Sequence, residues 1–80
     1  MERFTVRIEI AGEEFINKFE QMEYAKQFST KAIHLKGNET CDLEIIDNKV
    51  DRVPYVHYQI NGKVTKSNLI NRSVSSYFQD

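Results

Sequence analysis

Cysteine, proline, glycine and tryptophan are scarce in this sequence of 80 residues, which holds one cysteine, one proline, three glycines and no tryptophan. The single cysteine, Cys41, cannot form an internal disulfide, so packing or a partner subunit has to stabilise the fold. A four-ligand zinc site would have to rely on His34 and His57 beside that cysteine. The three glycines are widely spaced and make no phosphate-binding loop.

An excess of charge of either sign is also missing. The chain carries 11 basic and 12 acidic residues, for a net charge of −1. A non-specific nucleic-acid binder usually has a clear basic excess, because counterion release from phosphates drives its affinity. A DNA mimic would have a large acidic excess instead, so the charge balance speaks against both classes.

Long hydrophobic runs are absent as well. No stretch approaches the roughly 20 apolar residues that a membrane span requires, and the first residues lead into an alternating pattern rather than a signal peptide. Together with the lone cysteine, these features predict a cytoplasmic protein with no membrane partner. The composition, 40% hydrophobic and 11% aromatic, is typical of a folded globule and not of a disordered chain.

The clearest periodic pattern covers residues 21–35. At 100° per residue the apolar and charged side chains separate onto two sides, which predicts an amphipathic helix. The apolar side is expected to hold Met22, Tyr24, Ala25, Phe28, Ala32, Ile33 and Leu35. We expect Gly37, in a left-handed conformation and followed by Asn38, to end this helix. No good capping residue marks its start.

Strict alternation of apolar and polar residues predicts strands at 4–10, 14–19, 40–46 and 55–60, with an extended segment over 50–53. The alternative for 14–19 is an early start of the helix near Glu13; the strand is favoured because Phe15, Ile16 and Phe19 fit the apolar side of the helix poorly. Asn61-Gly62 predicts a type I′ turn and a tight hairpin that continues into a short fifth strand.

The side chains of residues 55–60 are assigned to faces by their hydrophobicity. We expect Val56, Tyr58 and Ile60 to face the helix. Tyr55, His57 and Gln59 then lie on the open face of the sheet. Pro54 lacks a backbone donor, so we expect it at an edge or just outside the ladder. The other residues expected on the open face are Thr5, Arg7, Glu9, Asp42, Glu44 and Ile46.

These elements predict an α+β fold, an antiparallel sheet of four to five strands in β-β-α-β-β order with one amphipathic helix across one face. Residues 1–66 form the compact domain. Residues 67–80 form a C-terminal amphipathic segment that packs in cis or against a partner. Its apolar residues recur at helical spacing, which predicts a helix: Leu69, Ile70, Val74, Tyr77 and Phe78.

Catalytic and metal-binding patterns are not found. A Cys–His nucleophile needs the imidazole within hydrogen-bond reach of the thiol, but Cys41 is expected to face inward while His34 and His57 are expected on solvated faces. Carboxylate pairs such as Asp42 and Glu44 are expected to solvate a strand face. We therefore predict no catalytic, cofactor-binding or metal-binding residue, and no enzymatic activity.

The apolar side chains left uncovered by this fold predict a protein-binding site, because a small monomer seldom exposes a large apolar patch. Its expected residues are Ile46, Tyr55, His57, Leu69, Ile70, Val74, Tyr77 and Phe78. The alternative is a domain that binds single-stranded nucleic acid, RNA in particular. In that case Tyr55 and His57 would stack bases on the open face of the sheet.

In size, composition and β-β-α-β-β order the chain resembles the small accessory proteins of phages and mobile elements. The resemblance covers the whole chain, rests on no motif and transfers no residue roles. It implies a small non-enzymatic protein-binding module that regulates or inhibits a host protein sterically. The expected partner is a host protein or a second copy of this chain in a homodimer.

Overall fold

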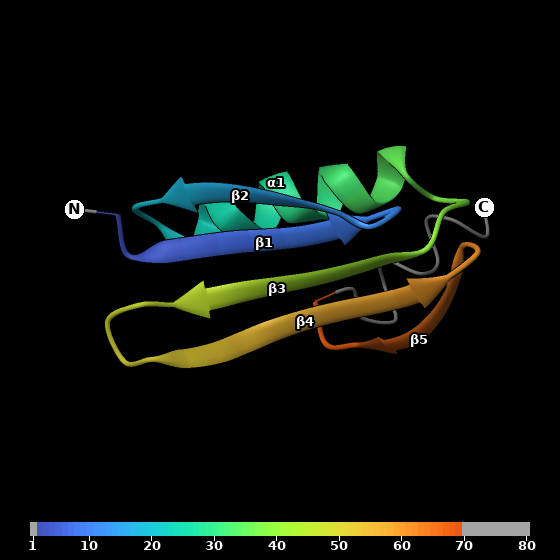
Figure 1. Ribbon diagram of the computed structural model, residues 1–80. Coiled ribbons are helices and arrows are strands. Elements are labelled where there is room, and N and C mark those ends of the chain that lie inside the picture. The colour runs from blue at the N-terminus through green and yellow to red at the C-terminus, as the bar shows by residue number, and fades with distance from the viewer. Residues whose placement is uncertain (1, 70–80) are drawn as a thin grey trace.

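The computed structural model describes residues 2–69 and shows a five-stranded antiparallel sheet with one helix (Figure 1). In chain order the elements are β1 (Phe4–Ile10), β2 (Glu13–Phe19), α1 (Met22–Leu35), β3 (Cys41–Asp47), β4 (Arg52–Ile60) and β5 (Lys63–Ser67). The predicted antiparallel α+β architecture is confirmed. The order is β-β-α-β-β-β, because the short segment after the Asn61-Gly62 turn forms a fifth strand.

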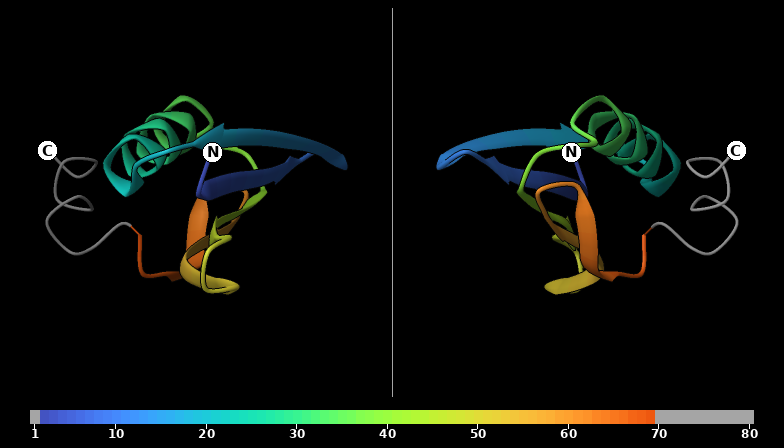
Figure 2. Two further views of the ribbon diagram at one scale, coloured as in Figure 1. Left: turned by 90° about the vertical axis from the view of Figure 1, so that its left-hand side faces the viewer. Right: turned by 90° about the vertical axis from the view of Figure 1, so that its right-hand side faces the viewer.

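The strands lie in the order β2-β1-β3-β4-β5, so β2 and β5 are the two edges of the sheet. The helix carries the chain from β2, past β1, to β3, and it lies on one side of the sheet (Figure 2). Its contacts are with β1, β2 and β3. The helix therefore covers the part of one face that β2, β1 and β3 form. Among the described residues no element covers the other face.

The core lies between α1 and the three strands beneath it. Its buried residues are Phe4, Val6, Ile8, Ala25, Ile33, Leu43, Ile45 and Leu69. Strand alternation brings these side chains together, because the register places Val6 opposite Ile45 and Ile8 opposite Leu43. Burial of this apolar surface is the main stabilising contribution, at about 25 cal/mol per Å².

Two residues expected on the apolar side of α1 are exposed. Tyr24 is 53% exposed and Leu35 is 71% exposed. The helix contacts β1, β2 and β3, and these two side chains lie outside the buried part of that contact. Ser29, in contrast, is fully buried. Its hydroxyl donates a 2.7 Å hydrogen bond to the carbonyl of Ala25, which satisfies the side chain inside the helix.

The start of α1 agrees with the prediction from the sequence, and its C-terminal end does not. Gln21 at the N-cap makes no side-chain hydrogen bond, in agreement with the missing capping residue. The prediction of a left-handed Gly37 is wrong, since the positive-φ glycines are Gly12 and Gly62. The last turn is closed instead by the N–H of Lys36, which donates to the carbonyls of Ala32 and Ile33.

Two hairpins have two-residue turns with positive φ at both positions. In the β4–β5 hairpin φ is 51° at Asn61 and 84° at Gly62, which confirms the predicted type I′ turn. Ala11 and Gly12 join β1 to β2 with φ of 54° and 82°. Alanine adopts this conformation at a steric cost, which the pairing of β1 with β2 has to offset.

The predicted C-terminal segment falls mainly on residues 70–80, which lie outside the described residues. Ser67, where that segment was expected to begin, ends β5 instead. Leu69 is 7% exposed and belongs to the core. Within residues 2–69, no helix is long and apolar enough to cross a membrane.

Candidate protein-binding site

β4 presents the opposite face from the one predicted. The partners of its helix-facing residues on β3 are all buried, with Tyr55 opposite Ile45, His57 opposite Leu43 and Gln59 opposite Cys41. Directly opposite residues point to the same side of a sheet, so the predicted placement of Tyr55, His57 and Gln59 on the open face is wrong. The open face holds the residues that were expected inside: Val56, Tyr58 and Ile60.

Hydrogen bonds at both ring nitrogens hold the His57 side chain. Its Nε2 lies 2.8 Å from Gln59 Oε1, and its Nδ1 lies 2.9 Å from Ser67 Oγ. The amide nitrogen of Gln59 donates to the carbonyls of Lys36 (3.1 Å) and Glu39 (2.7 Å), which leaves its oxygen to accept from His57 Nε2. His57 Nδ1 then accepts the hydroxyl proton of Ser67.

These contacts give the physical reason for the orientation of β4. His57 is fully buried and Gln59 is 2% exposed, yet no polar atom of either side chain is left unpaired. A buried polar group is costly only when it lacks a partner. The partners of Gln59, which are 23 and 20 residues away in the sequence, thus help to turn the polar face of β4 inward. Burial lowers the pKa of His57, and the hydrogen bond with Gln59 partly opposes this shift.

A register shift accompanies the proline of β4. Between the pairs Ile45–Tyr55 and Asp47–Arg52, β4 advances three residues while β3 advances two. The additional residue makes a β-bulge next to Pro54, which is a usual place for a proline within a sheet. Pro54 therefore lies in a gap of the β3–β4 ladder, and β5 pairs with β4 only from His57 onward, in agreement with the predicted position at an edge or just outside the ladder.

The predicted binding residues do not form one surface. Ile46 is half-buried on the open face, whereas Tyr55 and His57 lie on the helix-covered side and Leu69 is in the core. Tyr55 is further covered by Lys26, whose ammonium lies 4.6 Å from the centre of the ring. The remaining predicted binding residues, Ile70, Val74, Tyr77 and Phe78, lie outside the described residues.

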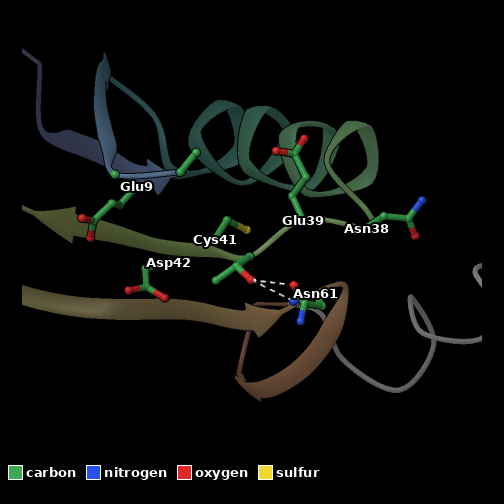
Figure 3. Close-up of a pocket in the computed structure, with 9 residues that line it drawn as sticks. Glu9, Asn38, Glu39, Cys41, Asp42 and Asn61 are labelled. Atoms are coloured by element: carbon green, nitrogen blue, oxygen red, sulfur yellow. Dashed lines mark hydrogen bonds between the residues drawn. The ribbon is translucent and has the colours of Figure 1, made fainter.

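A polar hollow of about 510 Å³ lies at one end of the sheet, beside Cys41 (Figure 3). The carboxylates of Glu9, Glu39 and Asp42 line it but point in different directions (Figure 3), and the described residues contain no cluster of three side chains that could hold a metal ion. Burial raises the pKa of the Cys41 thiol, and the carboxylates of Asp42 and Glu39 raise it further. The thiol is therefore a poor nucleophile at neutral pH, and both ring nitrogens of His57 are engaged elsewhere.

The open face of the sheet carries a network of charged groups centred on Arg7. Its Nε donates to Glu44 Oε1 at 3.1 Å and its NH1 donates to Glu14 Oε2 at 3.2 Å. The hydroxyl of Tyr58 donates to the second oxygen of Glu44 at 3.2 Å. Burial raises the pKa of Tyr58, and the neighbouring Glu44 carboxylate raises it further. Two carboxylates thus neutralise the one arginine at the centre of this face, which makes the surface unsuited to a phosphate backbone.

An apolar groove of about 570 Å³ runs between α1 and the β1–β2 hairpin. Its lining is Ile8, Ile10, Phe15, Asn17, Phe28, Lys31, Ala32, Leu35 and Lys36. Phe15 is 46% exposed and Leu35 is 71% exposed, so large apolar side chains from a strand and from the helix border the same opening. Such a groove suits the side chains of a bound protein segment.

The backbone of β2 is available along the same side. Within residues 2–69, β2 pairs with β1 alone, which leaves its other side as an open edge. Phe15 points to the helix-covered side and Ile16 to the opposite side, and both are nearly half exposed. Adjacent apolar residues on an edge strand are the sequence signal of this site, since one of the two stays uncovered whichever face carries the helix.

Comparisons of the chain with protein-family models, with curated proteins and with solved structures find no match.

Proposed function

We propose that this chain is a small non-enzymatic protein-binding module. Its binding site is the open edge of β2 together with the apolar groove between that strand and α1. The observation that carries the proposal is this juxtaposition: an unpaired strand edge lies directly beside an opening lined by Phe15 and Leu35. An extended protein segment can pair with the strand edge and place side chains in the groove at the same time.

The mode of binding is strand addition. A segment that pairs with β2 forms backbone hydrogen bonds with the sheet, and every second side chain of the segment points to the side where the groove lies. Aromatic or branched aliphatic side chains fill such an opening. Lys31 and Lys36 border the groove, which favours an acidic residue in the bound segment.

A module of this kind acts by occupying a surface of its partner. The network around Arg7 pairs the charged groups at the centre of the open face, and the Cys41 thiol and His57 are buried. These features support a role in binding rather than in chemistry. The role agrees with the resemblance to small accessory proteins that regulate or inhibit a host protein.

The nucleic-acid alternative loses the residues on which it depended. Tyr55 and His57 were expected to stack bases on the open face, and both lie on the helix-covered side. The aromatic residue that replaces them on the open face, Tyr58, is hydrogen-bonded to Glu44. We therefore propose protein binding at the β2 edge rather than nucleic-acid binding.

Selection from a random peptide library against the full-length chain tests the proposal. We expect enriched peptides with alternating apolar residues, and perturbation of the backbone amide signals of β2 in NMR spectra when such a peptide is added. The variant Leu35→Gln removes apolar contact area from the groove and should weaken peptide binding by about tenfold, since burying a leucine side chain contributes about 1.5–3 kcal/mol.

The matched control is Val50→Gln. Val50 is 52% exposed in the turn before β4, away from the groove, so its replacement should leave peptide affinity unchanged. Failure to enrich any peptide, or an equal loss of affinity in both variants, would count against a binding site at the β2 edge.

A further inference from the structure

The turn between β1 and β2 determines which backbone groups of β2 point outward. In a two-residue type I′ hairpin the residues that flank the turn, here Ile10 and Glu13, form a hydrogen-bonded pair. Bonded and non-bonded pairs then alternate along the ladder. The N–H and C=O groups directed away from β1 therefore belong to Glu14, Ile16 and Lys18, the residues of the non-bonded pairs.

We propose that two copies of this chain associate through these groups, with the two β2 strands antiparallel and Ile16 on the twofold axis. This inference names the partner of the site proposed above and rests on that proposed function. In this register Ile16 forms a hydrogen-bonded pair with Ile16 of the second copy. Glu14 forms one with Lys18 of the second copy, and the same pair recurs on the other side of the axis. Each outward N–H and C=O group thus finds a partner, which extends the sheet across both copies.

The charges of β2 are complementary to themselves in this arrangement. Glu14 lies near one end of the strand and Lys18 near the other, so antiparallel pairing places a carboxylate opposite an ammonium at two symmetric positions. The side chain of Glu14 is 56% exposed beyond its contact with Arg7. Lys18 is exposed and has no ion pair among residues 2–69. A shift of the register by two residues would place one of these charges opposite Ile16 instead.

The apolar side chains of β2 also gain cover. Ile16 is 49% exposed and would contact its symmetry mate on the open face. Phe15 lies opposite Asn17 of the second copy and diagonal to the second Phe15, a separation that aromatic side chains can span. Since Phe15 borders the apolar groove, the pairing would also shield part of that opening.

The other edge of the sheet is protected against such pairing. β5 carries Lys63 and Lys66 within five residues, and its register with β4 is interrupted between Tyr58 and Gln59. Lysines and bulges are the usual means by which natural sheets prevent association at an edge. The difference between the two edges favours β2 as the edge that associates.

A charge-swap experiment on the full-length chain tests this arrangement. Sedimentation equilibrium should show the wild type forming a dimer as its concentration rises. Glu14→Lys places lysines opposite each other at both symmetric positions, and Lys18→Glu does the same with glutamates. Each single variant should raise the dimer dissociation constant by about tenfold or more. A mixture of the two variants restores opposite charges at both positions, so it should form a heterodimer with nearly the affinity of the wild type.

Three further measurements keep the result unambiguous. Lys63→Glu, a charge reversal on β5, should leave the dissociation constant unchanged, and thermal unfolding verifies that Glu14→Lys remains folded despite the nearby Arg7. Hydrogen exchange at the amides of Glu14, Ile16 and Lys18 should slow as the protein concentration rises.

A wild type that stays monomeric to millimolar concentration, or a dimer that responds equally to Lys63→Glu and Lys18→Glu, would overturn the inference. If the monomer still binds selected peptides at β2, the proposed function stands without self-association. If it binds none, both fail.

Discussion

Gly62 is the point at which the β4–β5 hairpin meets the loop after α1. Its N–H donates to the carbonyl of Glu39 at 3.1 Å, and its φ is 84°. A Cβ at this position would lie 2.5 Å from the carbonyl oxygen of Gly37 and 3.1 Å from the Cα of Asn38. Both are backbone atoms, so neither can rotate away. The residue has to be glycine for two separate reasons, its conformation and its close contact.

Gly62→Ala should therefore lower the free energy of unfolding by about 2–4 kcal/mol, through left-handed strain and a backbone clash together. Gly12→Ala is the matched control, because φ there is 82° and no atom lies within 4 Å of the added Cβ. That variant should lose only the strain, about 1–2 kcal/mol. Urea unfolding measures both. Equal losses would mean that the contact with Gly37 does not affect stability.

At the scale of elements, Gln59 of β4 holds the C-terminal end of α1 in place. Its amide nitrogen donates to the carbonyls of Lys36 and Glu39, and its oxygen accepts from His57. The last carbonyls of a helix have no partner within the helix. The carbonyl of Lys36 accepts from the N–H of Glu39 at 3.0 Å and from the Gln59 side chain at 3.1 Å, so a strand residue adds a second donor at the end of the helix.

Gln59→Leu keeps a similar volume but leaves the buried Nε2–H of His57 without its acceptor, whereas the carbonyls of Lys36 and Glu39 keep the backbone N–H groups of Glu39 and Gly62 as donors. We expect the free energy of unfolding to fall by about 1–3 kcal/mol, since a buried polar group that loses its hydrogen bond costs about that much. Denaturant unfolding gives the loss. The neighbouring Ile60→Thr serves as control, because Ile60 is 57% exposed and a surface change of this kind stays within about 0.5 kcal/mol. A loss in Gln59→Leu no larger than in the control would show that the helix end needs no such contact.

At the scale of the whole molecule, the helix covers the part of one face that β2, β1 and β3 form. The two edges of the sheet differ, because β2 exposes adjacent apolar residues and β5 carries two lysines. The helix-covered face combines an apolar part under α1 with a polar part around His57. Ion pairs at the ends and centre of the sheet, such as the bidentate contact of Arg3 with Asp47 at 2.8 and 2.9 Å, add interactions across strands. The charged groups of the open face are thus paired within the domain, whereas the outward backbone N–H and C=O groups of β2 have no strand to pair with among residues 2–69.

The stability of the whole domain should depend on pH through His57. Burial lowers its pKa from the ordinary value of 6.5, so below that pH the unfolded chain binds a proton that the folded chain does not. Stability is then greatest above pH 6.5 and falls as the pH decreases, with a slope of at most about 1.4 kcal/mol per pH unit from this one group. Chemical unfolding between pH 8 and pH 5.5 measures the slope, because most carboxylates stay ionised in this range.

His57→Gln should flatten this profile. A pH profile of the wild type that is flat between pH 8 and 5.5, or one that His57→Gln leaves unchanged, would contradict the assignment to His57.

The sequence by itself determined the secondary structure and the class of fold. The alternation of residues 4–10 and the helical period of 21–35 are local patterns, and a segment has to bury its apolar side whatever else it packs against. The Asn61-Gly62 turn is local as well, because positive φ at two successive residues limits the residue types that can occupy it.

Only the tertiary structure decided which face of β4 turns inward and which edges stay open. A period of two predicts two faces but does not say which is buried, and hydrophobicity favoured Val56 over His57. Hydrogen bonds from Gln59 to carbonyls near the end of α1, far away in the sequence, reverse that choice. The candidate site at β2 likewise depends on strand order, a property of the assembled sheet. Contacts between segments distant in the sequence determine both the buried face of β4 and the order of the strands. A local pattern of residues does not predict such contacts.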